Sequence, residues 1–279
     1  YDNLPYNSNP AGTTPVVVAL DTVTPGIDFA LTTGERFGGQ VLDALTLVGV
    51  SGVGVSFFDA SGNGIGGAGT GGGGHYLSPA LPAGTYYAKT ERFEAYIQEL
   101  YGGTHFLYGD VRIGTPIVVP GSGTTAPIDF ALDVGGQIAG HITNAAGGAP
   151  VTNVSVEVFD ASGAGIWGWE PGSDGTGAYI TTGLPAGTYY IRTNGSHSFV
   201  NEFYDNLPYG SNVTSTTPVV VALGDVTPNI DFTLQTGGQF TGRAFDAVSL
   251  APLSGVGINI YDSTGTQLGW ANTDGSGQY

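Results

Sequence analysis

The chain contains no cysteine and no methionine, and only 6 of its 279 residues are lysine or arginine. Without cysteine, disulfide bonds and thiolate metal sites are excluded. Positive charge is scarce against 23 acidic residues, and the formal net charge is −17. Nucleic acid and anionic lipid bind basic surfaces, so neither is expected as a partner. No apolar run approaches the ~20 residues of a membrane-spanning helix, so no membrane span is expected in this sequence.

Glycine is abundant, with 49 residues, and 41% of the chain is hydrophobic. The sequence also holds 15 tyrosines and 13 phenylalanines. That apolar content is enough for packed cores, which argues against a disordered glycine-rich tract.

Several short motifs recur with a period of roughly 100 residues, the size of one β-sandwich domain. Leu-Pro-Ala-Gly-Thr-Tyr-Tyr occurs at 81–87 and 184–190. Gly-Gly-Gln occurs at 38–40, 135–137 and 237–239, and Ile-Asp-Phe at 27–29, 128–130 and 230–232. These positions predict the end of one repeat at 1–37, complete repeats at 38–134 and 135–236, and the start of another at 237–279.

Residues 135–236 predict seven short strands separated by Gly, Pro, Asn and Asp. Val154, Val156 and Val158 alternate with polar residues and should face a core. Asp160 to Gly163 is typical of a hairpin turn. Tyr86 and Tyr189, which follow the Pro-Ala-Gly turns, should be buried at equivalent places. The segment 63–74 of the first complete repeat is so rich in glycine that we expect a loop there.

The fold class expected is all-β: tandem seven-stranded antiparallel sandwiches, placed end to end through short links. Only residues 133–134 and 235–236 separate successive repeats. Linkers of this length limit the bending between domains.

The order of these motifs, with Asp-Gly-x-Gly-x-Tyr at 174–179 and 274–279, resembles the carboxypeptidase regulatory-like repeat. That group is related to the transthyretin-like and Cna-B-type sandwiches. The resemblance covers essentially the whole chain and implies an Ig-like or prealbumin-like Greek-key fold. It also implies a stalk or spacer in bacterial proteins that are secreted or surface-anchored. Some Cna-B relatives carry a Lys–Asn crosslink, but this chain has a single lysine, Lys89, whose counterpart is Arg192, so a crosslink in every repeat is excluded.

No arrangement typical of catalysis or of cofactor binding is apparent. The four histidines, His75, His105, His141 and His197, occupy different positions in the repeats and have no metal-ligand spacing. Calcium is the best metal candidate, at Asp174 or Asp274, but the carboxylate density of a calcium loop is missing. An Asp-Gly turn explains both aspartates better. We therefore expect neither an enzyme nor a cofactor.

Three tryptophans, Trp167, Trp169 and Trp270, follow the Asp turns. Exposed tryptophan can stack on sugar rings, which would indicate glycan binding. The alternative, which we favour, is that they cover the side of a sandwich or contact a neighbouring domain.

The sequence thus favours a structural role, as repeats of an extracellular filament or cell-surface stalk. Two alternatives remain: an adhesin for glycans and an accessory region of a secreted enzyme. The partial repeats at 1–37 and 237–279 would leave strand edges unpaired. We expect that the 279 residues are part of a longer array, or that strands are exchanged between copies. In either case the main partner is the same kind of repeat.

Overall fold

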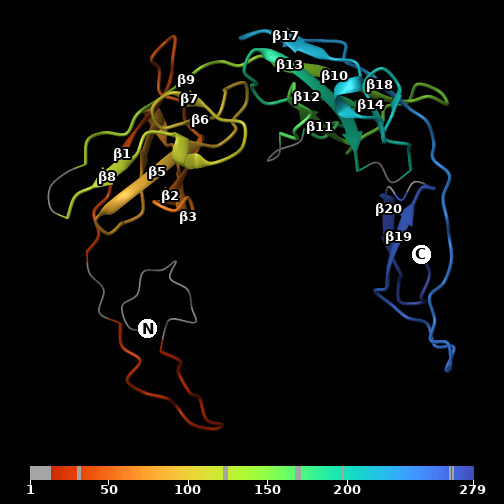
Figure 1. Ribbon diagram of the computed structural model, residues 1–279, viewed down its shortest axis with the longest axis horizontal. Helices are drawn as coiled ribbons and strands as arrows, with labels where there is room; N and C mark the ends of the chain where they lie inside the picture. The colour runs from red at the N-terminus through yellow and green to blue at the C-terminus, as the bar shows by residue number, and fades with distance from the viewer. Residues whose placement is uncertain are drawn as a thin grey trace. The chain divides into compact units, whose positions relative to one another are not determined.

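The computed structural model describes residues 14–29, 33–121, 125–166, 171–195, 198–263, 265 and 267–279. The chain forms two compact units (Figure 1). The first takes in most of the chain up to Gln137, and the second most of the chain from Ile138 onward. In the described part of the chain, no helix is long and apolar enough to cross a membrane.

The first unit contains two sheets, one with the strand order β4-β1-β9 and the other β3-β2-β5-β6-β7, in which β8 also pairs with β5. Its strands are β1 (Gly38–Asp43), β2 (Gly54–Asp59), β3 (Gly64–Gly69), β4 (His75–Leu77), β5 (Gly84–Thr90), β6 (Glu99–Leu100), β7 (Thr104–His105), β8 (Ile117–Val119) and β9 (Phe130–Leu132). Two short 3-10 turns, η2 (Gly72–Gly74) and η3 (Val111–Ile113), lie between them.

The second unit repeats this plan, with sheets β12-β10-β17 and β11-β13-β14-β15; β18 pairs with β10, and β16 with β13. Its strands are β10 (Gln137–Asn144), β11 (Ser155–Phe159), β12 (Ala178–Ile180), β13 (Gly187–Asn194), β14 (Glu202–Phe203), β15 (Leu207–Pro208), β16 (Val219–Val221), β17 (Val226–Thr227) and β18 (Phe232–Leu234), with a 3-10 turn, η4, at Val213–Ser215. A hairpin of β19 (Gly257–Tyr261) and β20 (Gln267–Asn272) follows.

The all-β prediction is confirmed, and the structure adds a detail to it. The first and last strands of each complete repeat pair in parallel: β1 with β9, and β10 with β18. These strands approach closely because glycine lies at the crossing. A Cβ on Gly39 would come within 2.1 Å of the carbonyl oxygen of Ile128, and one on Gly140 within 2.0 Å of that of Ile230.

The cores lie where the alternating pattern placed them. The valines at 154, 156 and 158 are buried, as are the matching residues Val53, Val55 and Phe57. In the first unit, Phe57 is in edge contact with Phe37 and stacked on Tyr76, with ring centroids 5.3 and 6.1 Å apart. Tyr86 and Tyr189 are 7% and 3% exposed, which confirms that they occupy equivalent buried positions.

The expectation of a loop at 63–74 was wrong. This segment contains β3, which pairs antiparallel with β2, and the turn η2. Glycine has low strand propensity, but β3 lies at the edge of its sheet, where backbone hydrogen bonds to β2 hold it and its two side chains, Ile65 and Ala68, pack against the core.

The alternation in β11 also does not extend to every side chain. Glu157, between two core valines, was expected to face water but is buried. Of residues 199–204, only Glu202–Phe203 forms a strand, β14.

Candidate functional site

Aspartates close several turns in the described part of the chain. Asp174 Oδ1 accepts hydrogen bonds from the Thr176 N–H and hydroxyl at 2.8 and 2.7 Å and from the Ala178 N–H at 3.0 Å. Asp274 makes the same contacts with Ser276 and Gln278. Hydrogen bonds from the side chain and backbone of Thr176 hold the pKa of Asp174 below its usual range. Both candidate calcium ligands are therefore turn-capping carboxylates, and that neither binds calcium stays a prediction.

A tyrosine and an aspartate fasten the parallel strands of each repeat. The hydroxyls of Tyr76 and Tyr179 donate to the carbonyls of Ile128 and Ile230, at 2.5 and 2.6 Å. Asp129 accepts from the N–H of Gln40 at 2.8 Å, and Asp231 from that of His141 at the same distance. These polar groups recur because they hold the fold, and each uses its hydrogen-bonding capacity within its own repeat.

A basic residue occupies the same position in both repeats, but the acid that pairs with it comes from a different place in each. Arg192 on β13 pairs with the buried Glu157, at an Nε to Oε2 distance of 2.5 Å, and Asn194 donates to the other carboxylate oxygen. The Arg192 guanidinium also lies 4.2 Å from the centroid of the Tyr209 ring.

The matching residue in the first repeat is Lys89, which faces Ser56 where Arg192 faces Glu157. Lys89 pairs instead with Glu91, two residues further along the chain, whose carboxylate lies 2.7 Å from the Lys89 ammonium. Both pairs therefore neutralise a cation at the same place in the sheet, and a structural role accounts for them.

A glutamate lies at the same position in each repeat, buried in the first and partly buried in the second. Glu99 on β6 is 3% exposed, and its carboxylate accepts a weak hydrogen bond of 3.3 Å from the Ala131 N–H. Burial raises the pKa of Glu99 to about 7, and the nearby charge of Asp133 adds to the effect. Burial also raises the pKa of Glu202, its counterpart on β14. Sequence reasoning missed both because each lies in a two-residue strand, too short to show alternation.

The histidines are dispersed over the structure. His105 lies 3.0 Å from Asp133, His75 contacts Gln40, and His141 is exposed, 3.8 Å from Asp231. His197 lies outside the described residues. Among the residues that the structure describes, no group of three or more His, Asp or Glu is arranged to hold a metal ion.

Trp270, on β20, is 63% exposed. Trp167 and Trp169 lie outside the described residues.

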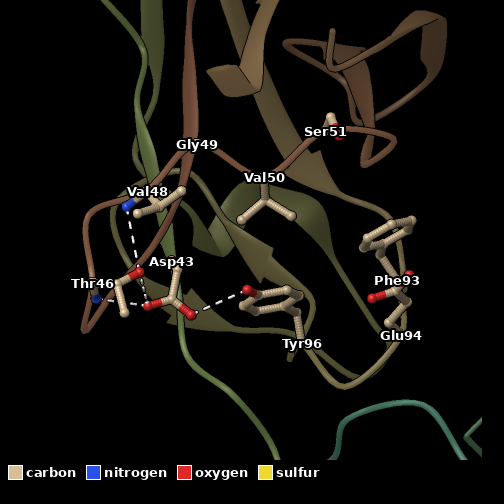
Figure 2. Close-up of a pocket in the computed structure, with 9 residues that line it drawn as sticks. All are labelled: Asp43, Thr46, Val48, Gly49, Val50, Ser51, Phe93, Glu94 and Tyr96. Carbon is tan, nitrogen blue, oxygen red and sulfur yellow. Dashed lines mark hydrogen bonds between the residues drawn. The ribbon is translucent and has the colours of Figure 1, made fainter. Parts of the chain in front are cut away.

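The first unit has an open depression of about 580 Å³ (Figure 2). It is lined by the turn after β1 and by the loop before β6: Asp43, Thr46, Val48, Gly49, Val50, Ser51, Phe93, Glu94 and Tyr96. The Tyr96 hydroxyl donates to Asp43 Oδ2 at 3.1 Å. No sequence motif pointed to this site, since its two halves are separated by about 40 residues.

No protein-family model matches the chain, and no curated protein matches it either. Among solved structures, the chain is similar to GBS52, the minor pilin of Streptococcus agalactiae, at 13% identity and a TM-score of 0.35, over 74% of this chain and 98% of that one. It is also similar to the shaft pilin SpaA of Lactobacillus rhamnosus GG, at 10% identity and a TM-score of 0.31, over 75% of this chain and 100% of that one.

A third similar structure is the Bacillus anthracis TIE protein, with 14% identity and a TM-score of 0.30 over 88% of this chain. This chain spans 42% of that protein's length.

Proposed function

We propose that this chain is a structural, non-catalytic repeat region of a bacterial extracellular filament or cell-surface stalk. The proposal rests on one observation. The polar residues that the two repeats have in common are those that hold the fold together. The recurring polar groups are the tyrosines and aspartates that hold the parallel strands together, with one neutralised cation per repeat. The histidines, by contrast, differ in position from one repeat to the next.

This pattern is what a spacer requires. A spacer needs every repeat to be stable, so the residues that stabilise the fold recur in each repeat. A catalytic site instead needs particular residues brought together in one place. In this role, repeats 38–134 and 135–236 are successive modules, and the partners are neighbouring repeats of the same chain or of other copies. The resemblance to carboxypeptidase regulatory-like repeats supports the same role.

Surface labelling tests the proposal. An antibody raised against residues 38–236 should label the outside of intact source cells, or filaments sheared from them, in immunogold microscopy. A control antibody against a cytoplasmic protein should label only permeabilised cells. Labelling confined to the cell interior would contradict the proposal.

A glycan-binding adhesin is the second candidate, because the indole of Trp270 is largely exposed. A glycan array with the full chain should then show selective binding that Trp270→Ala weakens at least tenfold. If Trp270→Ala leaves the array unchanged, or if nothing binds, this candidate is rejected.

A further inference from the structure

The depression in the first unit combines two aromatic rings with two carboxylates. Figure 2 shows Asp43 beside the ring of Tyr96, with Phe93 and Glu94 on the other side of that ring. None of its nine lining residues is a lysine, arginine or histidine. The site therefore carries negative charge that no side chain of its own lining neutralises.

Hydrogen bonds hold the Asp43 carboxylate in position and leave one of its oxygens able to accept a further donor. Its Oδ1 accepts three hydrogen bonds, from the Leu45 N–H and from the N–H and hydroxyl of Thr46, at 2.7–3.1 Å. Its Oδ2 accepts one, from Tyr96. A carboxylate oxygen has two lone pairs, so Oδ2 can accept one more donor. The bonds from Thr46 also keep the pKa of Asp43 low, so this carboxylate is ionised at neutral pH.

The opposite side is set by a tight turn. The Tyr96 N–H donates to the Phe93 carbonyl at 2.9 Å, and Glu94 within this turn has a positive φ of 47°. The turn places the Glu94 carboxylate and the Phe93 ring in the same lining as Asp43. Burial, followed by the hydrogen bond and the negative charges of Asp43 and Glu94, raises the pKa of Tyr96.

We propose that this depression binds an alkylammonium group, attracted by the negative charges of Asp43 and Glu94 and packed against the rings of Phe93 and Tyr96. Aromatic faces attract cations, and carboxylates supply the opposite charge. The group could be presented by a small molecule or by a lysine side chain of a peptide, and the two sources share this chemistry.

The second repeat offers an internal comparison. Asn144 faces Leu234 where Asp43 faces Leu132, and Phe199 bridges to Thr236 where Tyr96 bridges to Val134. The acid and the phenol are both replaced there, so we expect the site in the first repeat alone.

The test is a titration of the full chain, followed by NMR of the aromatic side chains, with choline, n-butylammonium and Nα-acetyl-lysine methyl ester as separate probes. We expect saturable shifts of the Phe93 and Tyr96 signals with at least one probe, and none with the neutral 1-butanol. Binding of choline or butylammonium indicates a small-molecule source, and preference for the lysine derivative indicates a peptide. Equal shifts with 1-butanol, or no shift with any cation, overturns the proposal.

Variants make the test specific. Glu94→Gln should weaken binding by about fivefold, as expected for one half-exposed charge contact, and Phe93→Ala by a similar factor. Asp246→Asn is the matched control, because Asp246 caps an equivalent turn with the same contacts to Val248 and Ser249. It should leave binding unchanged. If Glu94→Gln binds as well as the unmodified chain while thermal unfolding shows it folded, the proposal is wrong.

Discussion

At the scale of single residues, this chain uses its few cations and many carboxylates to hold its fold. Arg192 satisfies a carboxylate, Glu157, whose side chain is only 5% exposed. Lys89 pairs with Glu91, whose side chain is 44% exposed. Because water can solvate Glu91 but hardly Glu157, the two pairs should differ in their contribution to stability.

Arg192→Ala should therefore lower the free energy of unfolding of the second unit by about 3–5 kcal/mol, since it leaves a charge buried without its partner. Lys89→Ala should cost only about 1 kcal/mol in the first unit. Chemical denaturation of the two variants measures both values. An equal cost for the two substitutions would contradict this account.

Glu99 gives the first unit a defined pH response. In the folded chain its carboxyl has a pKa of about 7, against an ordinary value of 4.5. Between these values the folded state binds a proton that the unfolded state has released. The contribution to stability is therefore complete below pH 4.5 and is lost as the pH rises to about 7.

Glu99→Gln keeps the shape of the side chain and cannot ionise. It should raise the unfolding free energy at pH 8, by up to about 3 kcal/mol, and leave it nearly unchanged at pH 4. Thermal unfolding at the two pH values checks this. A variant less stable than the original at pH 8 would show that the ionised carboxylate is well accommodated.

Buried aromatic residues can be tested with a matched control. Tyr86→Ala and Tyr189→Ala should each cost about 3–5 kcal/mol in their own unit, because each removes a large side chain from the core. Tyr108, which is 45% exposed, serves as the control, and its substitution by alanine should cost much less. Urea denaturation monitored separately in the two units distinguishes these effects.

At the scale of elements, the parallel pairing depends on a glycine. Gly140→Ala would place a methyl group 2.0 Å from the Ile230 carbonyl oxygen, so β10 and β18 must separate. We expect a loss of about 3 kcal/mol, visible as a lower melting temperature. Gly175→Ala, where a Cβ meets nothing within 4 Å, is the control and should be close to neutral. If both variants melt alike, the close approach of the strands is wrong.

The strands of the cores could be predicted because valine, isoleucine and phenylalanine alternate there. The valines at 154, 156 and 158 and their counterparts are buried, as their alternation predicts. The turn at Asp160 also forms where aspartate and glycine predict it. The strand β3 could not be predicted, because four of its six residues are glycine, which leaves only Ile65 and Ala68 to show an apolar pattern. The acidic depression was also unpredictable, because Asp43 meets Tyr96 only through the pairing of distant segments.

At the scale of the whole molecule, six of the 23 acidic residues behind the net charge of −17 serve to close turns. Aspartates at 43, 59, 160, 174, 246 and 274 each accept backbone N–H groups in a turn. This role requires no metal ion. Adding a chelator to the native chain should therefore change its melting temperature by less than a few degrees. A larger fall with EDTA, reversed by calcium, would restore a calcium site at Asp174 or Asp274.

The parallel pairing has a mechanical consequence. The chain enters each complete repeat on one strand of the pair and leaves on the other, running in the same direction. Tension along the chain therefore slides the two strands past each other, and the hydrogen bonds between them bear the load together. An antiparallel pair pulled from one end opens bond by bond under a smaller force. Each repeat therefore resists most strongly a force applied between its two ends.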